Sequence, residues 1–150
     1  MSNQEQGMTL LEIVIAAAVV GILASIALPG YRNYVLRANR AEGRSALLAL
    51  ATAQEKFYLQ CNTYAATLDP TATTDCNAGR LRFSTRSERG YYRITMTSAD
   101  TDGWAAEAVP TVDSPQLDDV RCREYGLTST GARSARTSID IPNDVECWSR

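Results

Sequence analysis

The chain has 150 residues, with 15 basic and 17 acidic side chains, four cysteines and no histidine. This length predicts one domain, or a small domain with an accessory element, and the net charge of −2 gives no general attraction to nucleic acid or anionic membranes. The lack of histidine excludes histidine-based nucleophilic catalysis and histidine-ligated metal sites. We therefore expect a protein that is not an enzyme and has no metal or cofactor.

The first predicted element is an apolar helix over residues 8–28. A helix of these 21 residues would be roughly 31 Å long, which is enough to cross a bilayer. A cleaved signal peptide is the alternative, but no basic residue precedes the segment and helix-favouring sequence continues beyond it. The pattern therefore favours a retained membrane-spanning helix.

Glu12 is a carboxylate inside this apolar segment. A carboxylate at the centre of a bilayer costs about 2.5–3.5 kcal/mol on insertion scales, so such residues usually have a partner and a function. No basic residue precedes Glu12, so its cation would be a terminal amine or would come from another molecule. The alternative is a position near the end of the span, where the carboxylate reaches headgroup water.

Residues 7–12 (GMTLLE), followed by the apolar segment, resemble the prepilin signal of the type IV pilin family. The resemblance implies that a prepilin peptidase cuts after Gly7 and methylates the new terminal amine of Met8. It also implies that Glu12 guides assembly, because the Met8 amine of one subunit can neutralise Glu12 of a neighbour. A misplaced subunit would leave a buried charge unpaired.

A helical pattern continues from the apolar segment to about Gln60. With the span, this makes a helix of about 50 residues, or roughly 75–80 Å, which indicates a shaft with a head at one end. By the resemblance, Gly21 and Pro29 are helix-weakening positions that let the segment between them unwind in a filament. An apolar stripe faces the head, and Arg37, Arg40 and Arg44 lie on other faces. The stripe consists of Leu47, Leu50, Ala51, Gln54, Phe57 and Tyr58.

Four predicted strands follow an ordered loop over residues 61–79. Alternating patterns cover residues 80–83, 91–97, 104–109 and 120–127, and turn sequences separate them. They predict an α+β, pilin-like fold in which a four-stranded antiparallel sheet packs on the helix. The expected divisions are a leader at 1–7, the membrane and assembly half of the helix at 8–34, and a periplasmic globular head at 35–150.

The cysteines form an even set without a C-x-x-C motif, and beyond a membrane they predict disulfides. Three pairings are possible, and we favour the pairing of neighbours, Cys61 with Cys76 and Cys122 with Cys147. Residues 122–131 and the closing Cys147-Trp148 resemble the C-terminal disulfide region of pilins, most closely that of PilE-type minor pilins. Type II secretion pseudopilins share the N-terminal motif but usually lack this region.

Two signals disagree on membrane topology. Four arginines follow the span, and the positive-inside rule would place the C-terminal part of the chain in the cytoplasm. The cysteines and the cleavage motif indicate the opposite orientation. We follow the cysteines and predict a single-pass inner-membrane protein with its head in the periplasm, which becomes part of an extracellular pilus after assembly.

A cluster of arginines interleaved with aromatic residues is the candidate contact surface: Arg80, Arg82, Arg86, Arg89 and Arg93. It could bind DNA through phosphate contacts and stacking, pack against an acidic neighbouring subunit, or be a solvated sheet face. Residues 98–124 carry a net charge of −5 from seven acidic and two basic side chains. Within them, residues 100–103 (DTDG) are expected to form a hairpin turn, and Asp118 and Asp119 a solvated loop, rather than metal sites.

The resemblance implies a structural subunit of a type IV pilus, of the minor pilin class, supporting twitching motility, adhesion or surface attachment. Its partners would be other pilin subunits, the prepilin peptidase, the inner-membrane assembly machinery and the membrane itself before assembly. The alternatives are a pilus-associated DNA receptor for DNA uptake and a type II secretion pseudopilin.

Overall fold

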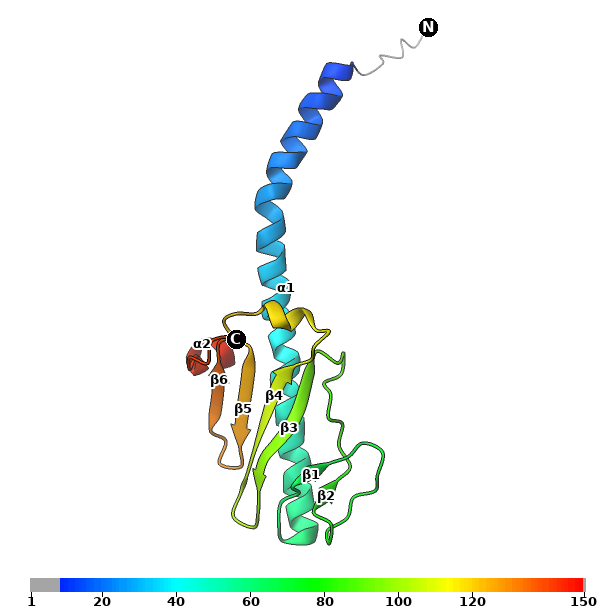
Figure 1. Ribbon diagram of the computed structural model, residues 1–150, viewed down its shortest axis with the longest axis vertical. Coiled ribbons are helices and arrows are strands. Elements are labelled where there is room, and N and C mark those ends of the chain that lie inside the picture. Colours follow the sequence, from blue (N-terminus) through cyan, green and yellow to red (C-terminus); the bar gives the residue numbers. More distant parts are fainter. Residues whose placement is uncertain (1–8, 150) are drawn as a thin grey trace, which may run out of the picture. The chain divides into compact units, whose positions relative to one another are not determined.

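The computed structural model describes residues 9–149 of the chain (Figure 1). It contains helix α1 (Leu10–Cys61), strands β1 (Thr67–Leu68), β2 (Arg80–Leu81), β3 (Tyr92–Ala99) and β4 (Trp104–Pro110), the short 3-10 helix η1 (Pro115–Asp118), strands β5 (Glu124–Thr128) and β6 (Arg133–Arg136), and helix α2 (Asp144–Trp148). The chain divides into two compact units, one ending at Val35 and the other beginning at Leu36. The expected cleavage residues Gly7 and Met8 lie outside the described residues.

Helix α1 begins with a side-chain cap and continues for 52 residues. Thr9 precedes it and accepts a hydrogen bond from the Glu12 backbone N–H at its side-chain Oγ1, over 3.3 Å. A threonine three residues before a glutamate is the sequence of a capping box, which satisfies backbone N–H groups of the first turn. Pro29 lies inside the helix, where its ring removes one backbone donor.

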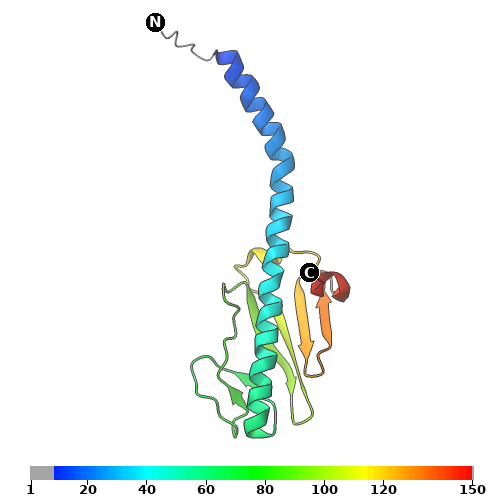
Figure 2. The same cartoon turned by 180° about the vertical axis from the view of Figure 1, so that it is seen from behind.

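The head, from Leu36 onward, has the expected four-stranded antiparallel sheet on a helix, so the predicted fold class is confirmed. The strand order is β3-β4-β5-β6. Ile94 lies opposite Ala108 in the first pair, and Tyr125 lies opposite Ala135 in the last. Figure 2 shows α1 running across one face of this sheet.

One strand assignment was wrong. The first expected strand, residues 80–83, forms only the two-residue β2, which pairs in parallel with β1 as a separate sheet. The fourth strand of the main sheet is β6, which the sequence pattern missed. The hairpin into β6 turns at Gly131, whose φ of +80° suits glycine because it has no Cβ. A four-residue strand with two arginines gives almost no period-two signal.

The core of the head lies between the sheet and the apolar stripe of α1. Leu47, Leu50, Gln54 and Phe57 of the expected stripe are buried, whereas Ala51 and Tyr58 are only partly buried. They pack with strand residues that alternate toward the helix, among them Tyr92, Ile94, Trp104, Ala106, Tyr125 and Leu127.

Gly43 permits a close approach of helix α1 to the sheet. A Cβ at this position would lie 3.2 Å from atoms of the Tyr92 ring, so the ring rests directly on the helix backbone.

Both disulfides join cysteines that are neighbours in the sequence. Cys61, the last residue of α1, is bonded to Cys76, which closes the loop before β2. Cys122, just before β5, is bonded to Cys147 of α2. The second pair is almost fully buried, and it fastens the C-terminal segment to the sheet.

We predict that the two disulfides differ in their contribution to stability. Replacing Cys122 and Cys147 together with alanine should lower the free energy of unfolding by about 3–5 kcal/mol, because chain entropy is regained and a buried contact is lost. The same change at Cys61 and Cys76, which are more exposed, should lower it by less. Denaturant unfolding of the full chain in detergent, followed by tryptophan fluorescence, measures both values, and equal losses would contradict the prediction.

Candidate functional site

The N-terminal unit presents an apolar surface without a partner inside the described part of the chain. Its large aliphatic side chains are exposed, Leu10, Val20 and Ile26 among them, and α1 is long and apolar enough to cross a membrane. Burying such a surface in lipid or against other helices is strongly favourable, at about 25 cal/mol for each Å² removed from water. This unit is therefore a surface for a membrane or for helix packing.

Between residues 10 and 28, two polar side chains interrupt this surface. Glu12 lies in the first turn of α1, where a negative charge also stabilises the helix N-terminus. Ser25 satisfies its hydroxyl locally by donating a hydrogen bond to the Ile22 backbone oxygen over 2.7 Å. The carboxylate is thus the side chain that needs an external partner in an apolar environment. The expected helix-weakening positions, Gly21 and Pro29, are both helical here.

The five arginines of the predicted contact surface differ in whether they have an acidic partner. Arg80 pairs with Asp75 at 3.7 Å, and Arg89 pairs with Glu42 at 3.0 Å. Arg82, Arg86 and Arg93 are exposed and make no ion pair with any residue between 9 and 149.

Arg86 and Arg93 face each other in an isolated antiparallel bridge, which concentrates two positive charges at the β3 edge of the sheet. Of the five arginines, three are therefore free of acidic partners among residues 9–149, and the structure places two of these three opposite each other.

Glu42 of α1 holds the loop that carries Arg89. Its side chain is almost buried and accepts hydrogen bonds from the Ser87 hydroxyl, from the Arg89 backbone N–H at 2.9 Å and from the Tyr91 backbone N–H at 3.4 Å. The Arg89 guanidinium adds a charged partner, and its carbon Cζ also lies 5.0 Å from the centre of the Tyr91 ring. The Glu42 carboxylate therefore attaches the loop that leads into β3 to helix α1.

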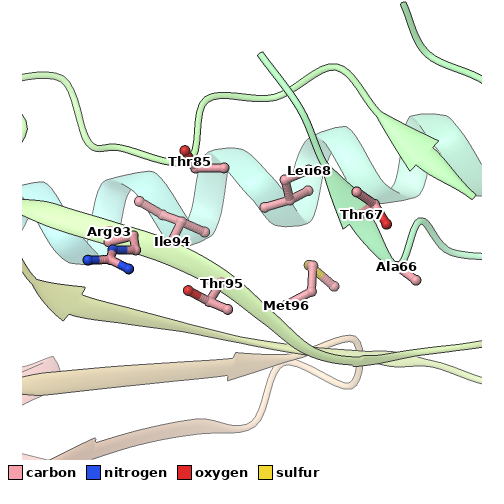
Figure 3. A pocket seen from close by; sticks show the side chains of 8 residues that line it. All are labelled: Ala66, Thr67, Leu68, Thr85, Arg93, Ile94, Thr95 and Met96. Atoms are coloured by element: carbon pink, nitrogen blue, oxygen red, sulfur yellow. The ribbon is translucent and has the colours of Figure 1, made fainter. Parts of the chain in front are cut away.

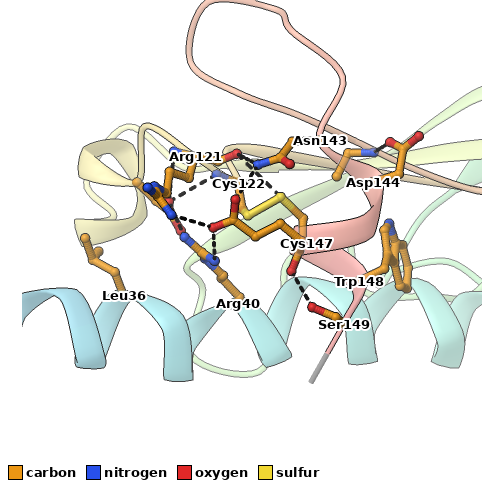
Figure 4. Close-up of a disulfide and its surroundings, with 12 residues drawn as sticks. Leu36, Arg40, Arg121, Cys122, Asn143, Asp144, Cys147, Trp148 and Ser149 are labelled. Atoms are coloured by element: carbon orange, nitrogen blue, oxygen red, sulfur yellow. Dashed lines mark hydrogen bonds and ion pairs between the residues drawn. A yellow bond between two sulfur atoms is a disulfide. The ribbon is translucent and has the colours of Figure 1, made fainter.

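A second buried carboxylate, Asp119, pairs with Arg40 of α1 (Figure 4). Two parallel hydrogen bonds of 2.7 and 2.9 Å join the guanidinium to the carboxylate, and Asp119 also accepts the backbone N–H groups of Arg121 and Cys122. Burial by itself lowers the pKa of the Arg40 guanidinium, but the hydrogen bond and charge of Asp119 outweigh it and raise the pKa.

This pair corrects two expectations. Arg40 was expected on a helix face other than the stripe that packs on the head, and Asp119 in a solvated loop. Both side chains are buried, and they pair with each other. Their separation of 79 positions left no sequence signal for the contact.

Buried tyrosines extend this polar contact toward the sheet. The Gln116 side-chain amide donates to the Tyr92 hydroxyl over 3.0 Å and to the Leu36 backbone oxygen over 3.2 Å. Burial raises the pKa of Tyr92 to about 12 and also raises the pKa of Tyr125. Both phenols therefore stay neutral at physiological pH. The Tyr92 hydroxyl accepts a hydrogen bond from Gln116, whereas the buried Tyr125 hydroxyl has no hydrogen-bond partner among the described residues.

In the C-terminal disulfide region, the guanidinium of Arg133 lies over the Trp148 ring, a contact that the sequence reasoning missed. The guanidinium carbon of Arg133 lies 5.1 Å from the centre of the Trp148 ring, and the Trp148 indole N–H donates to the Ser134 backbone oxygen over 2.8 Å. Arg44 of α1 donates to the Ser149 backbone oxygen over 2.6 Å. The closing Cys-Trp motif was the available signal, but it did not reveal which arginine would lie beside the ring.

Two acidic residues of segment 98–124, Asp100 and Asp119, have partners within the head. Asp100 accepts the backbone N–H groups of Asp102 and Gly103 over 2.8 and 3.0 Å, which makes the β3–β4 connection a hairpin turn. Asp119 is neutralised by Arg40. These two carboxylates are therefore engaged by partners within the head.

Comparison with known proteins identifies the class. Residues 29–126 match a family model described as "Type IV minor pilin ComP, DNA uptake sequence receptor", and residues 2–28 match the "Prokaryotic N-terminal methylation motif". The chain belongs to the type IV pilin family, and the resemblance noted in its sequence is confirmed.

Individual relatives agree. The chain is 30% identical over 143 residues to the type IV major pilin protein PilA of Myxococcus xanthus, covering 95% of this chain and 57% of that protein. It is 30% identical over 104 residues to the type IV major pilin protein PilE of Neisseria gonorrhoeae, covering 68% of this chain and 62% of that protein. It thus spans about three fifths of the length of these relatives. The crystal structure of the non-core minor pilin PilV of Neisseria meningitidis is similar, with a TM-score of 0.49 and 22% identity, covering 70% of this chain and 90% of that one.

We predict that Asp119 is a principal polar determinant of head stability. Asp119→Ala leaves the Arg40 guanidinium buried without its carboxylate and should lower the free energy of unfolding by about 3–5 kcal/mol. The neighbouring Asp118 is exposed, so Asp118→Ala should change it by less than about 0.5 kcal/mol. Denaturant unfolding of both variants measures the difference, and similar values for the two would refute the assignment.

Proposed function

We propose that this protein is a structural subunit of a type IV pilus, of the minor pilin class, and that it polymerises through its N-terminal apolar helix. The observation that carries the proposal is a lone carboxylate, Glu12, at the start of a helix whose apolar surface is otherwise exposed. Membership in the pilin family supports it, as does the match of residues 29–126 to a minor pilin model. The filament would support twitching motility, adhesion or surface attachment.

Before assembly, the apolar part of α1 lies in the inner membrane and the head lies in the periplasm. The prepilin peptidase cuts between Gly7 and Met8 and methylates the Met8 amine, and the match to the methylation motif supports this step. The inner-membrane assembly machinery then moves the helix from lipid into a bundle of similar helices. The apolar surface stays buried throughout, while Glu12 gains the amine of a neighbour.

We expect that Glu12→Ala is still inserted and cleaved but fails to enter pili, because the subunit loses the charge that selects its position. Ser25→Ala, which changes the other polar side chain of the span, should enter pili normally because its hydroxyl bonds only within its own helix. Immunoblots of sheared pili and of membrane fractions separate assembly from insertion. Normal incorporation of the Glu12 variant would eliminate the proposed role.

A second candidate function is DNA binding at the pilus. The family model that matches this chain is described as a DNA uptake sequence receptor. Arg82, Arg86 and Arg93 are exposed without acidic partners between residues 9 and 149, and Arg86 and Arg93 lie opposite each other at the β3 edge. Guanidinium groups free of carboxylates are available for phosphates, and Tyr91 and Phe83 beside them are only partly buried. Such a receptor would serve DNA uptake while it remained a pilus subunit.

The DNA hypothesis predicts a specific salt dependence. Replacing Arg82, Arg86 and Arg93 with alanine should reduce the slope of log affinity against log salt by about 0.9 for each lost phosphate contact on duplex DNA. Arg37→Ala, at an exposed arginine on α1, serves as the matched control and should leave the slope nearly unchanged. Fluorescence anisotropy with the full chain in detergent measures the slope, and absence of binding at low ionic strength removes this function.

A further inference from the structure

The exposed large aliphatic side chains of the head, residues 36–149, are unevenly distributed. Leu48 and Leu59 lie on α1, at 45% and 83% exposure. The others lie in two connecting segments, residues 111–123 and 137–148, which we call the rim. They are between 54% and 88% exposed and comprise Val112, Val120, Ile139, Ile141 and Val145. The rim is therefore the part of the head where apolar side chains protrude from several segments.

The rim lies at the end of the head where α1 enters. Because β4, β5 and β6 pair in antiparallel order, β4 ends, β5 begins and β6 ends at the same end of the sheet. Within the rim, Gln116 donates a hydrogen bond to the Leu36 backbone oxygen, and Asp119 pairs with Arg40 (Figure 4). These contacts fasten the rim to the first turns of α1 that belong to the head.

The apolar segment of α1 ends only a short way along the chain from the head. Tyr31 and Tyr34 follow its last aliphatic residue, Leu28, and are 67% and 71% exposed. Tyrosine is enriched at the membrane–water interface, where its ring lies at the level of the headgroups. Tyr34 precedes Leu36 by two residues, which is about 3 Å of helix. A helix anchored by these tyrosines therefore keeps the start of the head close to the lipid surface.

The cleft beside β3 offers no comparable surface. Its volume is about 340 Å³, and Figure 3 shows that the chain around β1, Thr85 and residues 93–96 of β3 line it. Its large apolar side chains, Leu68, Ile94 and Met96, are buried or half-buried. The protruding aliphatic side chains are thus a feature of the rim and are not shared by this hollow.

The charges of the rim do not depend on an anionic partner. Asp113 and Asp118 are exposed and make no ion pair with any residue between 9 and 149. Arg121 is already paired with Glu146 at 3.0 Å. An occupant of the rim is therefore bound by apolar contact rather than by a surplus of positive charge. The surface of a bilayer accepts aliphatic side chains in this way.

We propose that, before assembly, the rim docks on the periplasmic surface of the inner membrane, with Val112, Val120 and Ile139 inserted among the lipid headgroups. Exposed apolar side chains gathered on one surface mark sites of membrane or protein contact, and the continuity of α1 with the apolar segment favours the membrane. Docking holds the head against the bilayer until the subunit is extracted. The inference rests on the membrane stage of the proposed pilus subunit and adds a lipid contact made by its head.

Quenching by lipid tests this docking. All four cysteines are in disulfides, so a thiol-reactive NBD fluorophore labels only an introduced cysteine. Full-length Val120→Cys and Ile139→Cys are labelled and placed in phosphatidylcholine nanodiscs that contain a lipid with a shallow doxyl group. Leu59→Cys is the matched control, because Leu59 is also an exposed aliphatic residue but lies roughly 35 Å along α1 from Leu36. Because the quencher is confined to the bilayer, we expect about fivefold stronger quenching at positions 120 and 139 than at position 59.

The contribution of the aliphatic side chains is measured with the probe at Val120→Cys. Val112→Ser combined with Ile139→Ser should lower the quenching about threefold, because apolar contact with the bilayer is lost. Leu48→Ser combined with Leu59→Ser, at the exposed aliphatic residues of α1, should leave the quenching unchanged. If the two double variants are quenched equally, the anchored helix alone accounts for the proximity to lipid, and the docking is overturned.

A probe in the apolar segment separates this inference from the proposed function. Ile22→Cys with the same fluorophore should be strongly quenched; if it is not, the membrane stage of the proposed function fails and the docking fails with it. Quenching at Ile22 but no more at positions 120 and 139 than at position 59 overturns the docking alone. A probe at these two positions that is unquenched in nanodiscs but becomes buried in sheared pili assigns the rim to a neighbouring subunit, which overturns the docking while the pilus function stands.

Discussion

The buried pair of Arg40 and Asp119 is the interaction on which the arrangement of the head depends. It lies where the head begins on α1, and its carboxylate also accepts the backbone N–H groups that lead into Cys122. Removing two charges from water is favourable only when each is fully hydrogen-bonded. The bidentate geometry therefore requires the helix, the segment after η1 and the disulfide to reach their places together. The cost of misplacing any of them is an unpaired charge in the core.

The two parts of α1 meet different physical demands. In the N-terminal part, the exposed aliphatic side chains need an apolar environment that a membrane or other helices supply. Glu12 restricts this environment further, because its carboxylate needs a partner there. In the head, the apolar stripe of the same helix faces the sheet, and a few buried polar side chains accompany it. This division explains why the average composition resembles that of an ordinary soluble domain. The net charge of −2 comes from Glu5 and Glu12, and the residues from Pro29 onward carry 15 charges of each sign.

Much of the fold could be predicted from local sequence patterns. The predictions that failed concerned contacts between residues far apart in the sequence. The helix, its apolar stripe and three of the four main strands were readable because each has a strong period over many residues. Strand β6 was not, because its sequence RSAR exposes two arginines and buries only Ala135. The arginine cluster was found, yet its division into paired and free members depends on Glu42, which is 47 positions from Arg89. Charge patterns in sequence show which residues can pair, and only tertiary structure shows which do.

The contact of Tyr92 with the backbone at Gly43 has a mechanical consequence. The flat Tyr92 ring lies on helix backbone that has no side chain. At this point, therefore, no helix side chain interlocks with the sheet to oppose its rotation about the helix axis. The ion pairs of Arg40 with Asp119 and of Glu42 with Arg89, on either side of Gly43, oppose this rotation. Residues two apart on a helix point about 200° from each other, so Arg40 and Glu42 reach the sheet domain around opposite sides of Gly43. These two opposed contacts add to the packing of Leu47, Leu50 and Phe57 against the sheet, and together they oppose rotation of the head about the helix axis.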